Sequence, residues 1–121
     1  MLLFIVSNGA MAEWDFVTET DNSYYYADRD AIIKKGNIVK MWVMVDFNSP
    51  QKLADKTYLS IRSMYEFNCV EVTATTKSMD FYSANMLDNG EIVSSAELNK
   101  YRDIAPNTAL KELWKTACGK Q

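Results

Sequence analysis

The centre of the chain alternates between apolar residues and residues of mixed character. In the segment 37–47, NIVKMWVMVDF, every second position is apolar, and the segment 58–69, YLSIRSMYEFNC, repeats the pattern with one serine as an interruption. A period of two is typical of a β-strand with one buried face. The two apolar faces comprise Val39, Met41, Val43, Val45 and Phe47 in the first segment, and Leu59, Ile61, Tyr65, Phe67 and Cys69 in the second.

Further strands are predicted on both sides of this pair. The aromatic and β-branched runs at 13–19 and 23–28 are separated by a polar turn, and strand character continues through 70–83. We expect a single helical turn or a loop within 28–37, a connecting loop over 48–56, and a tight turn with positive φ at Asn89-Gly90. Because the connections are short and contain no long helix, the strands are expected to form an antiparallel sheet.

One convincing helix is predicted, over residues 106–120. Asn107 or Thr108 can serve as its N-cap after Pro106, and Gly119 marks its end. One face of this helix is apolar and has to be buried, so the sheet is its natural partner. The predicted fold class is therefore α+β, with a mostly antiparallel sheet and one C-terminal helix packed on it. The apolar stripe comprises Leu110, Leu113, Trp114, Ala117 and Cys118.

The first residues predict an export signal. Leu2 to Val6 form an apolar run, followed by Ala10-Met11-Ala12, the A-x-A pattern that signal peptidase cleaves. The alternative is a hydrophobic first strand, and the cationic segment that normally begins a signal peptide would have to lie upstream. We predict a truncated signal peptide over 1–12 and a single domain over 13–121. No cysteine follows the predicted cleavage site, so a lipid anchor is not expected there.

Composition excludes most catalytic chemistry. The chain has no histidine, which removes the commonest general base and metal ligand, and two cysteines alone cannot complete a structural zinc site. The motif G-x-S-x-G does not occur, and Asp28 and Asp30 lack the ligand spacing of a calcium loop. We therefore expect no enzyme, no metal and no cofactor. With a net charge of −3 and no basic run longer than Lys34-Lys35, nucleic acid is not an expected partner.

The two cysteines lie on faces that would meet if the helix packs on the sheet. Cys69 shares a strand face with Tyr65 and Phe67, and Cys118 belongs to the helix stripe. The periodicity gives no distance, so two free buried cysteines remain an alternative. An export signal favours a disulfide, which would close a loop of about 50 residues and contribute about 4 kcal/mol by the chain-entropy estimate.

Several segments together resemble the surface-adhesin protein E family, small exported proteins of Gram-negative bacteria. The matching features are Trp14, YYADRDAI (25–32), KKGNIVKMWVMVDF (34–47), YEFNC (65–69), FYS (81–83), GEIVSS (90–95) and LWKTAC (113–118). The resemblance implies an antiparallel sheet with a C-terminal helix, joined by a disulfide between a strand cysteine and a helix cysteine. It also implies binding of host matrix or serum proteins and the ability to dimerise. The chain departs from the family's namesake because it has no lipidation cysteine near Ala12.

Aromatic residues are the candidates for an interface. Tyr24, Tyr25 and Tyr26 are consecutive and cannot all face inward, and Trp42, Met44 and Met64 lie opposite the apolar faces. Alternatively, a second layer or the N-terminal strand covers these side chains. We predict an exported, non-enzymatic module that binds protein partners, located in the periplasm, released or at the cell surface. The alternative is a periplasmic structural or housekeeping protein, for which a homodimer is again an option.

Overall fold

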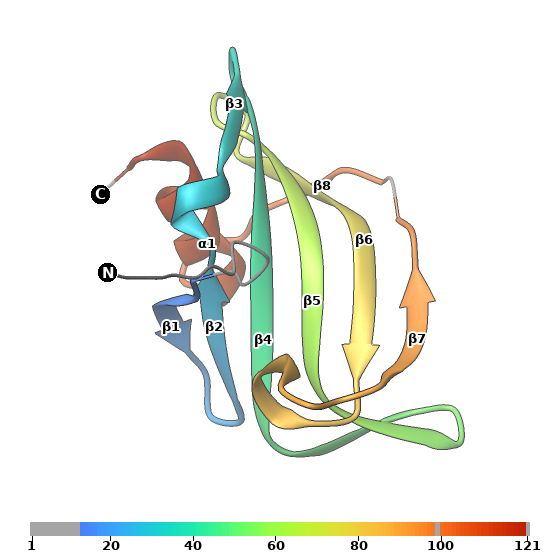
Figure 1. Ribbon diagram of the computed structural model, residues 1–121. Coiled ribbons are helices and arrows are strands. Elements are labelled where there is room, and N and C mark those ends of the chain that lie inside the picture. Colours follow the sequence, from blue (N-terminus) through green and yellow to red (C-terminus); the bar gives the residue numbers. More distant parts are fainter. Residues whose placement is uncertain (1–12, 99, 121) are drawn as a thin grey trace, which may run out of the picture.

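A computed structural model describes residues 13–98 and 100–120. Over these residues the fold is an antiparallel sheet with a single α-helix packed on one face (Figure 1). The strands are β1 (Asp15–Glu19), β2 (Ser23–Ala27), β3 (Ile33–Lys35), β4 (Ile38–Leu53), β5 (Lys56–Asn68), β6 (Thr73–Tyr82), β7 (Ile92–Ala96) and β8 (Arg102–Asp103). Two short 3₁₀ turns, η1 (Arg29–Ala31) and η2 (Asn85–Leu87), precede the helix α1 (Ala109–Cys118).

The sheet follows the order β1-β2-β4-β5-β6-β7, with β3 paired to β4 and β8 paired to β6. Every pairing is antiparallel. The two predicted apolar faces coincide, because Val39 lies opposite Phe67 and Val45 lies opposite Ile61 in the β4–β5 register. The predicted fold class is confirmed.

The helix begins and ends at predicted residues. Of the two N-cap candidates, Thr108 is used: its Oγ1 accepts a hydrogen bond of 3.2 Å from the backbone nitrogen of Lys111. Gly119 ends the helix with φ 68°, the left-handed conformation that glycine adopts without steric cost. The two ends therefore follow from local chemistry that the sequence already contains.

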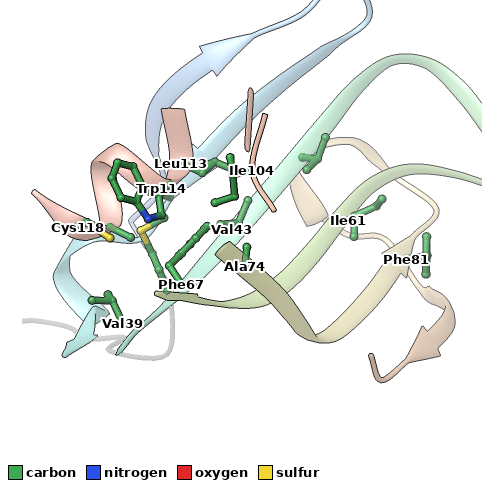
Figure 2. Close-up of a cluster of buried hydrophobic side chains, with 14 residues drawn as sticks. Val39, Val43, Ile61, Phe67, Ala74, Phe81, Ile104, Leu113, Trp114 and Cys118 are labelled. Carbon is green, nitrogen blue, oxygen red and sulfur yellow. The ribbon is translucent and has the colours of Figure 1, made fainter. Parts of the chain in front are cut away.

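The main core lies between α1 and the sheet. The predicted helix stripe faces inward, with Leu113, Trp114 and Ala117 buried and Leu110 partly buried against the cluster. In Figure 2 the helix side chains meet Val39, Val43 and Phe67, whereas Ile61 and Phe81 continue the core farther along the sheet. At that end edge-to-face aromatic pairs join Phe47 to Tyr58 and Tyr58 to Phe81, with ring centroids 5.7 and 4.9 Å apart.

The prediction of a connecting loop over 48–56 is wrong, because most of this segment belongs to strands. β4 continues to Leu53, and a turn at Ala54 and Asp55 connects it directly to β5, which begins at Lys56. The extended strand includes Pro50, whose backbone nitrogen cannot donate a hydrogen bond to a neighbouring strand. It is accommodated because the β4–β5 register shifts between Asp46 and Gln51, so Pro50 does not need a ladder partner.

Two other connections differ in detail from the predictions. The helical turn expected within 28–37 is η1, but Ile33–Lys35 form the additional strand β3. At the Asn89-Gly90 turn, the positive φ of 55° belongs to Asn89. The turn is part of a longer β6–β7 connection rather than a two-residue hairpin, because η2 intervenes. The signal peptide predicted over 1–12 lies outside the described residues.

Candidate functional site

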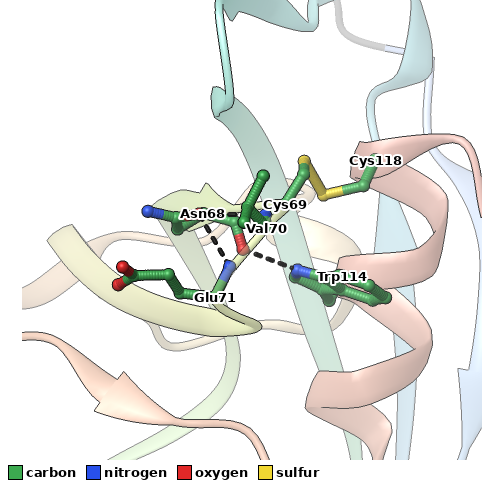
Figure 3. The surroundings of a disulfide bond; sticks show 6 residues. All are labelled: Asn68, Cys69, Val70, Glu71, Trp114 and Cys118. Carbon is green, nitrogen blue, oxygen red and sulfur yellow. Dashed lines mark hydrogen bonds between the residues drawn. A yellow bond between two sulfur atoms is a disulfide. The ribbon is translucent and has the colours of Figure 1, made fainter.

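Cys69 and Cys118 form a disulfide that ties the end of β5 to the last turn of α1 (Figure 3). Their Cα atoms are 5.7 Å apart although 49 positions separate them in sequence. The Asn68 side chain arranges the turn around Cys69 by accepting hydrogen bonds of 2.9 Å from the backbone nitrogens of Val70 and Glu71. The thiols are consumed in a structural link, so they do not provide a reactive group.

The sheet face opposite α1, here called the outer face, carries a row of aromatic and polar side chains. Phe16 of β1 pairs with Tyr26 of β2, and the two rings meet edge to face with centroids 5.9 Å apart. The row continues through Met44 to Arg62, because Tyr26 lies opposite Met44 and Met44 lies opposite Arg62. Phe16 is 50% exposed, so the row ends at the sheet edge in an accessible aromatic ring.

The six predicted interface residues do not form one exposed surface. Tyr24 is 37% exposed, and Tyr26, Trp42 and Met64 are half-buried. Tyr25 packs against the core cluster instead, as the alternation of a strand requires, and Met44 is completely buried. Of these six predicted residues, four therefore retain accessible surface on the outer face: Tyr24, Tyr26, Trp42 and Met64.

Arg62 organises the centre of the outer face. Its guanidinium carbon lies 4.4 Å from the centroid of the Trp42 ring, and its Nη2 contacts Asp80 Oδ2 at 3.2 Å. Ser95 Oγ donates to the other carboxylate oxygen of Asp80 at 2.8 Å. The indole ring is held in place by a cation–π contact whose cation is itself anchored, which reduces the side-chain entropy lost on binding.

The β6–β7 connection folds over one end of the outer face, on the opposite side of the sheet from α1 (Figure 1). Asp46 Oδ1 accepts hydrogen bonds from Asn85 Nδ2 at 3.0 Å and from the backbone nitrogen of Met86 at 2.7 Å. The buried Ser60 hydroxyl donates to the Ala84 carbonyl at 2.5 Å and accepts from the Leu87 nitrogen at 3.1 Å. These hydrogen bonds hold the β6–β7 connection in place at one border of the outer face.

The surroundings of Tyr26 on the outer face affect the pKa of its hydroxyl. Removal of water raises the pKa of Tyr26 above its ordinary value, and the negative charge of Asp46 acts in the same direction. The phenol therefore remains neutral throughout the physiological range. It can serve as a hydrogen-bond donor with an apolar body, the combination that suits tyrosine to protein interfaces.

Two residues of this surface were missed in the sequence. Phe16 belongs to a predicted strand, but nothing in the local pattern shows that it is exposed beside Tyr26. Arg62 lies on the predicted polar face of its strand, where its contacts with Trp42 and Asp80 depend on the register of three strands. Arg62 lies opposite Met44, and Trp42 lies opposite Met64, so the stack is a diagonal contact that the alternation within either strand does not indicate.

Within residues 13–98 and 100–120 no cluster of three or more His, Cys, Asp or Glu side chains is arranged to hold a metal ion. No helix in this part of the chain is long and apolar enough to cross a membrane.

Comparison with known proteins identifies the family. The chain superposes on crystal form II of Haemophilus influenzae protein E with a TM-score of 0.68 and 18% identity, covering 88% of this chain and 87% of that chain. For protein E from non-typeable Haemophilus influenzae the TM-score is 0.62, with 16% identity and coverage of 94% and 82%. No curated protein matches the sequence significantly. The family described as surface-adhesin protein E matches residues 14–119. The chain therefore belongs to the surface-adhesin protein E family.

Proposed function

We propose that this chain is an exported, non-enzymatic binding module that recognises a protein partner through the outer face of its sheet. The observation that carries the proposal is an accessible aromatic group, Phe16, Tyr24 and Tyr26, that continues into the Arg62–Trp42 stack. Aromatic residues and arginine are enriched at protein interfaces and provide most of their binding energy. Membership of a family described as surface adhesins supports both export and binding.

The anchored geometry also supports recognition. Arg62 is held between the Trp42 ring and the Asp80 carboxylate, and η2 is bonded to Asp46 and Ser60 at the border. A surface whose side chains are already ordered loses little conformational entropy when a partner binds. A partner would meet aromatic rings at the β1–β2 edge and a charged, hydrogen-bonded network toward β6.

The test is capture of partners by the immobilised full chain from a solubilised extracellular-matrix preparation and, separately, from a cell-envelope extract. Phe16→Ala and Trp42→Ala are expected to weaken capture of the same protein at least tenfold, the loss expected when an interface anchor is truncated. Val70→Ala is the matched control, because Val70 is 67% exposed but lies in the β5–β6 turn.

Tyr25→Ala separates folding from binding, because this ring packs on the core. It should lower the melting temperature, whereas Phe16→Ala should not. Capture that is unchanged in both outer-face variants contradicts the proposal. Cell fractionation distinguishes locations: protein found only in the periplasm, with capture only from the envelope extract, would favour a structural role there over adhesion.

A further inference from the structure

A second surface, which differs in composition from the aromatic outer face, lies where the end of α1 meets η1 and β1. The structure has a groove of about 490 Å³ there, here called the helix groove. Its apolar lining includes Val17 and Ile32, which are both half-buried and pack against the core cluster. Its charged lining consists of Arg29, Glu112, Lys115 and Lys120.

The groove is shaped by two local irregularities. The β1–β2 register shifts between Phe16 and Thr18, which leaves Val17 as an extra residue without a partner in β2. Such a bulge redirects a side chain, and Val17 lines the groove while Phe16 contacts Tyr26 on the outer face. At the other side, the left-handed Gly119 turns the chain back, and the Lys120 nitrogen donates to the Lys115 carbonyl at 2.8 Å.

The charge of the groove opposes that of the whole chain. The chain carries a net charge of −3, yet the groove lining has three cations and one carboxylate. Glu112 is engaged by Lys115 at 3.3 Å. Arg29 and Lys120 have no ion-pair partner among the described residues, and both are exposed. Two cationic groups therefore remain available beside an apolar floor.

We propose that the helix groove binds an acidic peptide segment of a partner protein, with an aliphatic side chain against Val17 and Ile32 and carboxylates facing Arg29 and Lys120. The basic rim provides the charge complementarity. The aliphatic floor favours a peptide, because a purely hydrophilic anion would leave that apolar surface without a contact. The inference goes beyond the proposed function, since it concerns another surface and does not require the outer face to bind anything.

Fluorescence polarisation with the full chain and three labelled peptides tests the proposal. The first peptide alternates Glu and Leu, the second has Gln in place of Glu, and the third has Ser in place of Leu. Saturable binding is expected for the first peptide alone, and it should weaken with added salt because the contacting charges are solvent-exposed. The double variant Arg29→Gln/Lys120→Gln should weaken this binding about tenfold, from the loss of two charge contacts.

Matched variants make the result specific to the groove. Lys52→Gln/Lys100→Gln removes the same charge from exposed lysines outside the groove and should leave the affinity unchanged. Ile32→Ala should reduce binding of the Glu–Leu peptide. Because Arg29 and Lys120 are exposed, their double variant tests the proposal even if Ile32→Ala fails to fold. Phe16→Ala should have no effect, which separates this site from the outer face.

The proposal is overturned if the Glu–Leu peptide does not bind, or if the Gln peptide binds equally well. An equal loss of affinity in the Lys52/Lys100 control would also overturn it, because the effect would then be one of net charge. Preferential binding of a sulfated oligosaccharide or of vesicles of anionic phospholipid, abolished by the Arg29/Lys120 variant, would assign the groove to a different class of ligand.

Discussion

The indole nitrogen of Trp114 donates a hydrogen bond of 2.9 Å to the backbone carbonyl of Asn68 (Figure 3). Asn68 immediately precedes Cys69, whose disulfide partner Cys118 lies one helical turn beyond Trp114. The helix is therefore fixed to the end of β5 by a covalent bond and a hydrogen bond that are adjacent. The indole is buried, so its N–H group would have no compensating water if the carbonyl moved away.

Replacement of Trp114 by Phe should lower the free energy of unfolding by about 1–3 kcal/mol, because the Asn68 carbonyl loses its donor while an aromatic ring is retained. Urea denaturation of the oxidised protein measures the change. A difference below about 0.5 kcal/mol would mean that the hydrogen bond contributes little net stability.

Removal of the disulfide in the double variant Cys69→Ser/Cys118→Ser should cost about 4 kcal/mol, because the unfolded chain regains the freedom of the closed loop. Chemical denaturation of the variant, beside wild type with and without a reducing agent, provides the measurement. If the denaturant concentration at the mid-point of wild-type unfolding is the same with and without the reducing agent, this expectation is contradicted.

The contact between Asp46 and the β6–β7 connection predicts a local effect. Asp46→Ala removes the acceptor of the Met86 nitrogen and one of the two acceptors of the Asn85 amide, so the 84–90 segment should open more readily. Hydrogen–deuterium exchange should become faster there, while global stability falls by only about 1 kcal/mol, the usual net value of such hydrogen bonds.

The control for this experiment is Asp88→Ala, on the same connection. The hydrogen bond of Asp88 within the connection comes from its backbone nitrogen to Asn85, so exchange should be unchanged. Equal exchange rates in the Asp46 variant and in wild type would show that this carboxylate does not hold the segment.

The Tyr101 hydroxyl should lose its proton at a higher pH than the hydroxyl of an ordinary tyrosine. Its hydroxyl donates to Glu66 Oε2, and partial removal of water together with this hydrogen bond and the Glu66 charge raises its pKa to about 12. The pKa of Tyr101 is higher in the folded protein than the value of about 10 expected for the unfolded chain. The neutral Tyr101 hydroxyl therefore contributes fully to folding stability below pH 10, and this contribution is lost as pH rises through about 12.

Tyrosinate absorbance as a function of pH checks this expectation. The difference between wild type and Tyr101→Phe should show one group titrating near pH 12. Glu66→Gln should move that step toward pH 10, because the carboxylate acceptor and its charge are removed. A difference spectrum with its mid-point at pH 10 in wild type would contradict the proposed contact.

The elements whose boundaries depend on local chemistry were predictable. The period of two in 37–47 and 58–69 identified β4 and β5 with their buried faces, and the stripe from Leu110 to Cys118 identified α1. The extension of β4 beyond Pro50 was not predictable in the same way. It depends on the pairing of Gln51 and Lys52 with β5, which is a relation between segments.

The sequence by itself determined which faces of the strands and of the helix are apolar, and it restricted the chemistry by containing no histidine and only two cysteines. The tertiary structure decided which of those groups meet. It placed the Cys69 and Cys118 Cα atoms 5.7 Å apart, buried Met44 and left Phe16 half exposed. The physical reason is that periodicity reports the direction of a side chain relative to its own backbone, whereas burial and contact depend on strand register and on the segments that cover each face.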